Sequence, residues 1–412
     1  MHQGTNGIIS RAANLALWFA STALSLASCR SDQVTDPAVP ESEPAEVSGS
    51  LTSLSTTPLS FYQVSASKGL HTCGVTTDNR AFCWGFNLFG ELGDGTFTNR
   101  SRPVAVVGAI PFRTISSGNI HNCGVTTENQ AYCWGGNSVG QIGDGTAATR
   151  LAPVLVVGGL KFRQVSTGMQ HTCGLTSASR IYCWGNNNFG QLGDGTTTTR
   201  FRPVSVYGSR SFRQVSAGSF HTCALTTANQ AFCWGNNNQN NLGDGTTVLR
   251  RVRPTAVATT LTFTQITAGY SHTCAVTAEA RAFCWGSGSS GEIGDGTTTQ
   301  RPQPRLVSGG LSFSRLTAGR SHTCGETTGN QGYCWGMNIY GAVGDGTNHN
   351  QRLVPVPVGG GLSFRQLSAG ELLTCGKTSA TLVYCWGRND FGQVGDGTTL
   401  NRELPAAVVG PM

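Results

Sequence analysis

The sequence is poor in charged residues, which make up 12% of its 412 positions, about half the usual share. Only three of the 28 basic residues are lysines. No segment after residue 30 approaches eighteen consecutive apolar residues. Low charge together with 38% apolar residues excludes a disordered, charge-rich chain, and the short apolar runs exclude a multispan membrane protein.

Motifs of common catalytic classes are also missing. The sequence holds no G-x-S-x-G elbow, no Gly-rich phosphate loop and no H-E-x-x-H. Its net charge of +7 comes without a dense basic run, so we expect no nucleic-acid binding. We therefore predict a protein that is not an enzyme and uses no cofactor. Spacing does not exclude paired carboxylates, so an enzyme acting on cell-surface polysaccharide stays open as the alternative.

Glycine and cysteine, in contrast, are abundant, with 56 and 15 copies. Cys29 stands alone, and the other fourteen cysteines form pairs with nine residues between the partners. The first cysteines of successive pairs are 50, 50, 50, 51, 50 and 51 residues apart, which indicates a sevenfold repeat. The pairs are Cys73 with Cys83, Cys123 with Cys133, Cys173 with Cys183, Cys223 with Cys233, Cys274 with Cys284, Cys324 with Cys334, and Cys375 with Cys385.

Each repeat contains four short extended segments, of the types FRQVSAG, HTCGLT, [FY]CWG and PVxV, separated by Gly- and Asn-rich turns and by GDGT. Nothing in the repeat shows helical spacing. This pattern predicts an all-β fold, a seven-bladed β-propeller of four-stranded antiparallel blades. The propeller is expected over residues 58–412, with repeats starting near 61, 112, 162, 212, 263, 313 and 364.

The ends of the repeat array suggest how the ring closes. The repeats begin with a first-strand segment at Phe61 and finish with Pro405–Val409. We expect these N- and C-terminal strands to pair in one blade and clasp the ring.

The two cysteines of a repeat define a hairpin register. If Cys73 and Cys83 are opposed in an antiparallel pair, Gly74 faces Phe82 and the turn lies at 77–79. Side-chain alternation then puts Phe82 and Trp84 on one face of the blade and the cysteines on the other. Stacked blades would set bulky against compact faces, so the repeated tryptophans are expected in the core between blades.

Residues 12–28 form a short apolar segment after Arg11, typical of a signal h-region. The segment ends in Leu-Ala-Ser followed by Cys29, which resembles the lipobox of bacterial lipoprotein signal peptides. The resemblance implies that residues 1–28 are removed and Cys29 is lipidated. Residues 29–57, rich in Pro, Ser and Glu, are expected to be a flexible tether. The predicted location is the bacterial envelope, facing an oxidising compartment and in the outer membrane if the host has one.

The repeat H-T-C-[GA]-[VL]-T … [FY]-C-W-G-x-N-x-x-G-Q-[LIV]-G-D-G-T resembles that of the regulator-of-chromosome-condensation family, and its bacterial, cysteine-bearing branch in particular. The resemblance covers residues 61–409 and implies a seven-bladed propeller that presents loops for protein contact. The nucleotide-exchange role of the founding member does not carry over, because the lipobox places this chain outside the cytoplasm.

Six histidines stand two residues before a cysteine, which raises the alternative of a metal site. No CxxC knuckle accompanies them, a fourth ligand is missing, and Leu373 replaces the histidine in the seventh repeat. Export to an oxidising compartment favours seven disulfides within repeats, no metal and structural histidines. The histidines are His71, His121, His171, His221, His272 and His322.

Each GDGT aspartate is expected to shape its turn, since one carboxylate per turn is too few for calcium. An arginine follows each turn and should anchor its loop by hydrogen bonds to neighbouring backbone, with carboxylate or phosphate recognition as the alternative. These arginines are Arg100, Arg150, Arg200, Arg250, Arg301, Arg352 and Arg402.

Variation between repeats marks the candidate binding surface. The tips after CWG and the residues before the histidine differ from repeat to repeat, as in binding scaffolds, although neutral drift would give the same pattern. The candidate binding residues are Leu70, Ile120, Phe220, Tyr270 and Arg320. We expect a monomer that binds a protein, or a glycan, through one propeller face.

Overall fold

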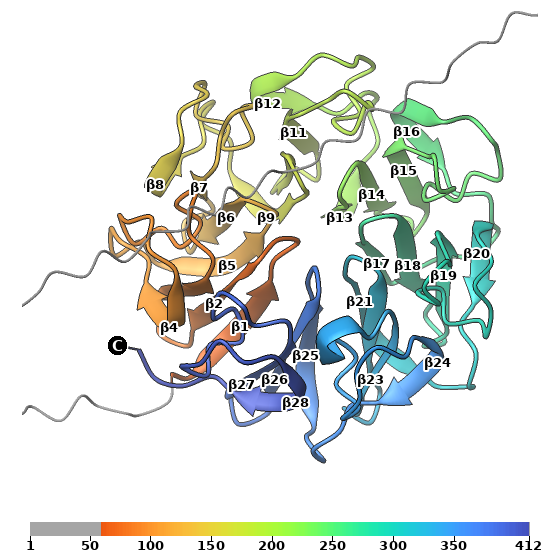
Figure 1. Ribbon diagram of the computed structural model, residues 1–412. Helices are drawn as coiled ribbons and strands as arrows, with labels where there is room; N and C mark the ends of the chain where they lie inside the picture. Colours follow the sequence, from red (N-terminus) through yellow and green to blue (C-terminus); the bar gives the residue numbers. More distant parts are fainter. Residues whose placement is uncertain (1–58, 412) are drawn as a thin grey trace, which may run out of the picture. The chain divides into compact units, whose positions relative to one another are not determined.

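The computed structural model describes residues 59–411 and confirms the predicted all-β fold, with seven four-stranded antiparallel blades in a ring (Figure 1). The expected signal peptide, Cys29 and the whole of the expected tether lie outside the described residues. Among the described residues, no helix is long and apolar enough to span a bilayer.

Each blade is a meander of four consecutive strands, and blades 1 to 7 are numbered in chain order. The innermost strands are β1 (Phe61–Ala66), β5 (Phe112–Ser117), β9 (Phe162–Thr167), β13 (Phe212–Ala217), β17 (Gln265–Ala268), β21 (Phe313–Ala318) and β25 (Phe364–Ala369). The second strands are β2 (His71–Thr76), β6 (His121–Thr126), β10 (His171–Thr176), β14 (His221–Thr226), β18 (His272–Val276), β22 (His322–Thr327) and β26 (Leu373–Thr378).

The third strands carry the CWG motif and the fourth form the outer rim. The third strands are β3 (Ala81–Gly85), β7 (Ala131–Gly135), β11 (Ile181–Gly185), β15 (Ala231–Asn236), β19 (Ala282–Gly286), β23 (Gly332–Gly336) and β27 (Val383–Gly387). The fourth are β4 (Arg100–Ala105), β8 (Arg150–Leu155), β12 (Arg200–Ser205), β16 (Arg250–Ala256), β20 (Arg301–Leu306), β24 (Arg352–Pro357) and β28 (Arg402–Ala407); a 3-10 turn, η1 (Ile339–Gly341), lies in a blade 6 loop.

The predicted hairpin register is confirmed in every blade. In blade 1, Cys73 faces Cys83 and Gly74 faces Phe82. The same opposition of two cysteines recurs in the other six blades. The nine-residue spacing therefore does place both cysteines at one level of the hairpin.

The opposed cysteines form seven disulfides, each within a single blade. The Cα–Cα distance is 4.0 Å in blade 1 and 4.0 or 4.1 Å in the others. The structure thus joins the pairs expected from the sequence and leaves none of these fourteen thiols free for a metal. The bonds are Cys73 to Cys83, Cys123 to Cys133, Cys173 to Cys183, Cys223 to Cys233, Cys274 to Cys284, Cys324 to Cys334, and Cys375 to Cys385.

The core lies between blades, where each tryptophan packs on the disulfide of the preceding blade. Trp134 contacts the Cys73–Cys83 pair, and Trp84 packs on the disulfide of blade 7. All seven CWG tryptophans are fully buried. The predicted bulky-on-compact stacking is therefore confirmed, and a Trp134→Ala change would remove a side chain worth about 3–5 kcal/mol.

One glycine of each GDGT turn is required by this packing. Gly93 has φ +64, and a Cβ there would lie 2.7 Å from the Trp134 indole nitrogen. Only glycine combines this backbone conformation with so close an approach.

Side chains on the inner strands clamp each blade to the next. The Gln63 amide donates to the Ile115 carbonyl and accepts from the Ile115 N–H, at 2.7 and 2.8 Å. Four more glutamines form the same pair of hydrogen bonds with the next blade. In all seven seams, the hydroxyl of a Ser or Thr two residues after this position accepts a hydrogen bond from a main-chain N–H of the next blade.

The expected clasp by strand exchange is wrong. Strand β28 pairs with β27 of its own repeat, so every blade is completed within one repeat. The ring closes through contacts between blades 7 and 1, including the Gln366 clamp on Val64 and a 2.8 Å bond from the Phe61 N–H to the Thr381 carbonyl. Because the same clamps join every other seam, closure needs no exchanged strand.

Blade 2 offers a direct measure of what one clamp contributes. Blade 2 has Thr114 where most other blades have the clamping glutamine. Among the described residues, no side chain forms hydrogen bonds with the N–H and C=O of Val165, whereas Gln63 bonds both of these groups in Ile115. Thr114→Gln is expected to raise the free energy of unfolding by about 1–2 kcal/mol in urea denaturation. Thr114→Asn, one methylene too short to reach, is the control, and equal stability of both variants would contradict the clamp.

Candidate functional site

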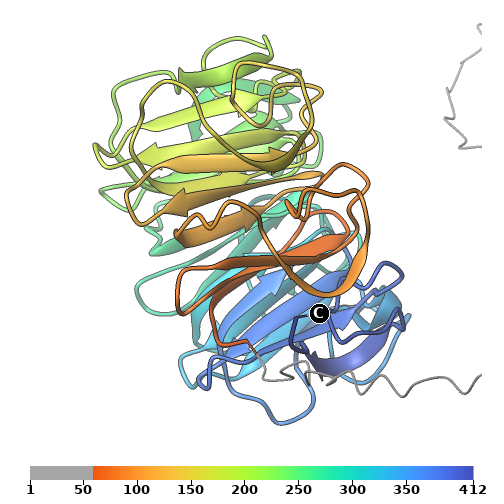
Figure 2. The same cartoon turned by 90° about the vertical axis from the view of Figure 1, so that its left-hand side faces the viewer.

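The variable segments meet on one end of the ring. Each blade's first-to-second and third-to-fourth strand connections lie together, as the 2.9 Å bond from the Phe86 N–H to the Leu70 carbonyl shows. We call this end the loop face. The opposite end, the turn face, carries the tight turns between the second and third strands, with residues such as Asn79 at φ 64. Figure 2 shows the ring from its side, with connections between strands at both of its ends.

On the loop face, side chains from five successive blades form a continuous row. Phe189 lies edge-on to Phe220 at 5.5 Å, and Phe220 lies edge-on to Tyr270 at 5.7 Å, between ring centroids. The Arg320 guanidinium is 5.4 Å from the Tyr270 ring centroid and pairs with the Glu371 carboxylate. We call these five residues the aromatic–cation row; three of the predicted binding residues belong to it.

Main-chain bonds between blades hold the row in place. The Tyr270 N–H donates to the Gly319 carbonyl at 3.1 Å, and the Arg320 N–H donates to the Gly370 carbonyl at 2.9 Å. The Arg320 side chain is still 46% exposed, while Phe220 and Tyr270 are half-buried. A fixed backbone with accessible aromatic and guanidinium groups lowers the ordering cost of binding.

Leu70 and Ile120 lie on the loop face but outside the row. They belong to blades 1 and 2, which the row does not reach. Both are half-buried, and their carbonyls accept N–H groups from the adjacent third-to-fourth strand loops. They therefore do not extend the row, and a role for them in binding stays a prediction.

The GDGT arginines anchor turns, by a contact that differs from the expected bond to neighbouring backbone. Each pairs with the aspartate of its own turn at 2.5–3.1 Å, and in blade 4 the partner is Arg251 instead of the predicted Arg250. Burial alone would raise the pKa of Asp94, but hydrogen bonds from Thr96 and Arg100 hold this pKa below its ordinary value. These arginines are therefore engaged by carboxylates.

The six histidines join blades rather than gather around a metal. His121 Nε2 lies 2.9 Å from Thr172 Oγ1 of the next blade, and the other five make the equivalent contact. Desolvation lowers the pKa of His121 to about 3, and it lowers the pKa of the others in the same direction. Among residues 59–411, no cluster of three or more His, Cys, Asp or Glu side chains could hold a metal ion.

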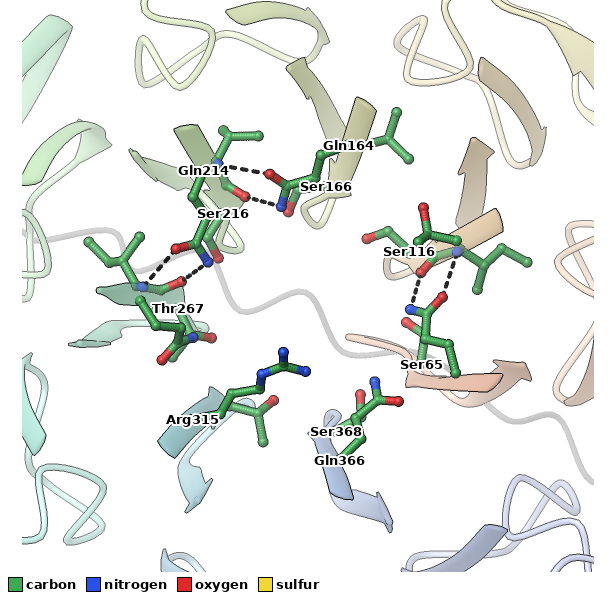
Figure 3. A pocket seen from close by; sticks show the side chains of 18 of the residues that line it. Ser65, Ser116, Gln164, Ser166, Gln214, Ser216, Thr267, Arg315, Gln366 and Ser368 are labelled. Carbon is green, nitrogen blue, oxygen red and sulfur yellow. Dashed lines mark hydrogen bonds between the residues drawn. The ribbon is translucent and has the colours of Figure 1, made fainter. Parts of the chain in front are cut away.

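The inner strands surround a central channel with a volume of about 320 Å³ (Figure 3). Its wall is polar, built from the clamping Gln and Ser or Thr side chains, with Arg315 extending into the open space. Of the described residues that line it, none carries a carboxylate. The arrangement that would favour the polysaccharide-cleaving alternative, two carboxylates in a central pocket, is not found here.

Comparison with known proteins assigns the chain to a family. The model of the RCC1-like domain matches residues 27–324, and the regulator of chromosome condensation (RCC1) repeat matches residues 382–412. The chain belongs to the RCC1-like domain family. A search of curated proteins finds no match to this RCC1-like chain.

Solved structures resemble the RCC1-like propeller in fold. Human WBSCR16 is 20% identical with a TM-score of 0.73, covering 81% of this chain and 94% of the other. Yeast RCC1 (Prp20), bound to Kap60, is 20% identical with a TM-score of 0.71, covering 79% and 83%. The ectodomain of the Physcomitrella patens receptor kinase CR4 is 23% identical with a TM-score of 0.54, covering 80% and 74%.

The RCC1-like propeller also carries an aromatic group that sequence reasoning missed. Phe86 and Phe391 meet edge to face at 5.0 Å across the seam between blades 7 and 1. Arg388 lies 5.9 Å from the Phe391 centroid and 5.6 Å from that of Tyr340. The tips holding these residues were recognised as variable, but their contact becomes visible only once the ring is closed.

Proposed function

We propose that this RCC1-like chain is a non-catalytic scaffold that binds a protein partner through its loop face. The observation that carries the proposal is the aromatic–cation row, which places Phe220, Tyr270 and Arg320 side by side on a fixed backbone. Aromatic and arginine side chains dominate binding energy at protein interfaces. Flat aromatic faces also suit a glycan, which we keep as the second class of partner.

Work on a structural neighbour supports a protein as the partner class. Yeast Prp20 has been crystallised with Kap60, and its binding to Gsp1p and histones has been described. Prp20 therefore binds other proteins. We propose the same class of activity here, without transferring any of those partners.

We further propose that the propeller, residues 58–412, is an exported monomer of the bacterial, cysteine-bearing branch. Residues 1–28 would act as the lipoprotein signal peptide, Cys29 as the lipidated residue, and residues 29–57 as the tether. Seven disulfides support an oxidising compartment, because cystines rarely persist in a reduced cytoplasm.

Site-specific photocrosslinking in the native host envelope tests both proposals. A photoreactive phenylalanine analogue at Phe220 is expected to capture a protein partner, and Arg320→Ala should abolish the adduct. The same analogue at Tyr62, an exposed aromatic position on the turn face, is the matched control. Adducts at Tyr62 but not Phe220 would contradict the loop-face site, and a Cys29→Ala variant that stays in the membrane fraction would contradict the anchor.

A further inference from the structure

Four arginines lie near the start of the inner strands, on the turn face of the propeller. The second residue of the inner strand is the extra residue of a β-bulge, which redirects its side chain. In four blades this residue is arginine, and Arg163 is among the residues that line the channel. We call these four residues the mouth arginines; they are Arg113, Arg163, Arg213 and Arg365.

Three of these arginines are oriented by bonds across the seams. Arg113 donates to the Arg163 carbonyl at 3.1 Å, and Arg163 donates to the Phe212 carbonyl at 2.8 Å. Arg213 bonds the next blade in the same way. Among the described residues, none of the four mouth arginines forms an ion pair with a carboxylate.

One layer deeper, Arg315 interrupts the ring of clamping glutamines. It holds the glutamine position in blade 6, and its guanidinium extends into the channel instead of clamping blade 7 (Figure 3). Glu326, on the second strand of blade 6, replaces the clamp by accepting a hydrogen bond from the Leu367 N–H of blade 7. Blade 6 has therefore kept its seam while placing a positive charge in the channel.

The channel offers few groups to neutralise this charge. Glu326 faces Arg315 in the strand pairing, but burial raises the pKa of its carboxyl to about 7. On the loop face, Lys68 of blade 1 donates to the Thr167 carbonyl of blade 3 at 3.0 Å. Burial lowers the pKa of Lys68 to about 8, so this group is still mainly positive at pH 7. The seam between blades 2 and 3 lies opposite blade 6 in the ring. There Thr114 replaces the clamping glutamine, so the Val165 N–H has no glutamine to bond.

We propose that the turn-face half of the central channel binds a small polyanion carrying two or more phosphate or carboxylate groups. Arg315 would be the deepest contact and the mouth arginines would hold the outer anionic groups through their forked donors. A volume of about 320 Å³ holds roughly ten waters, which is enough for such a ligand but not for a folded partner.

Titration calorimetry at low ionic strength tests the proposal with two probes, inorganic tripolyphosphate and citrate. Arg315→Gln restores the residue that five other blades carry, so the variant is expected to fold. We expect wild-type protein to bind at least one probe with a submillimolar dissociation constant and Arg315→Gln to weaken binding at least tenfold. The stronger probe identifies the ligand as a phosphate or a carboxylate compound.

Arg281→Gln is the matched control, because it removes one exposed charge at a position where blades 2, 4 and 6 carry glutamine. It is expected to change affinity less than twofold. Equal weakening by Arg281→Gln and Arg315→Gln would reduce the effect to net charge and overturn the site, as would the absence of binding to both probes. Phe220→Ala and Tyr270→Ala variants, which change the loop face, should leave anion binding unchanged, and this result would separate the two sites.

Discussion

Lowering the pH from 7 to 5 is expected to reduce the free energy of unfolding by about 7 kcal/mol, half or more of the usual stability of a domain. The cause is the set of six buried histidines that join neighbouring blades. Desolvation lowers the pKa of His71 to about 4 and of His121, His221, His272 and His322 to about 3.

The sign follows from proton uptake. In the folded protein these histidines stay neutral, whereas in the unfolded chain they titrate near pH 6.5. Below pH 6.5 the unfolded chain therefore binds more protons, and stability falls as the pH falls. Glu91 and Glu326 oppose this trend, because burial raises their pKa to about 7 and the folded state takes up their protons first. The histidines outnumber these carboxyls six to two.

Urea denaturation at half-unit steps between pH 8 and pH 5 measures this dependence. His221→Leu, which copies the natural Leu373 of blade 7, removes one titrating group and should reduce the loss by about 2 kcal/mol. The turn aspartates do not interfere, because their carboxyls titrate below this range when unfolded. A stability that is level from pH 7 to pH 5 would contradict neutral, buried histidines.

Reduction of all seven disulfides is expected to unfold the propeller. Each links cysteines 10 residues apart, and closing a loop of that length stabilises the fold by about 2–3 kcal/mol in the chain-entropy treatment. The sum, roughly 15–20 kcal/mol, exceeds the net stability of a typical domain. The loss is compounded because each cystine is also the surface on which the next tryptophan packs.

Guanidinium denaturation with and without reductant, together with a count of freed thiols, checks this expectation. Replacing the single Cys173–Cys183 pair by alanines is the graded control, with an expected loss of about 2–3 kcal/mol plus the packing lost beneath Trp234. A reduced protein with all thiols free and an unchanged midpoint would contradict a fold that depends on its cystines.

Much of the fold follows from the sequence because the same spacing of cysteines and aromatic residues recurs in all seven repeats. The cysteine spacing determined the hairpin register, and alternation then separated Trp84 from the disulfide face, as found. The clasp was wrong for a definite reason. The repeat period gives the length of one blade but does not say whether the chain termini lie between two blades or within one. Hydrogen bonds such as those of Gln366 with Val64 join blades 7 and 1 as they join the other blades, so termini between two blades need no exchanged strand.

The candidate site was predictable only in part. Residue type singled out Phe220, Tyr270 and Arg320, but their contact depends on loops from different blades meeting on one end. Leu70 and Ile120 share that end without joining the row, since their blades lie beyond its reach. Arg315 was missed because a single arginine in a column of glutamines looks like drift until the channel is seen.

The leucine at position 373 gives the ring an acid-resistant joint. At six seams a histidine bonds the next blade, but blade 7 meets blade 1 through Leu373, which does not titrate. That seam also joins segments that are 302 residues apart in sequence. Because the entropic cost of closing a loop grows with its length, breaking this contact would give the chain the largest gain in conformational entropy. In acid, protonation would therefore loosen the joints between sequence neighbours first and leave the two ends of the array fastened to each other.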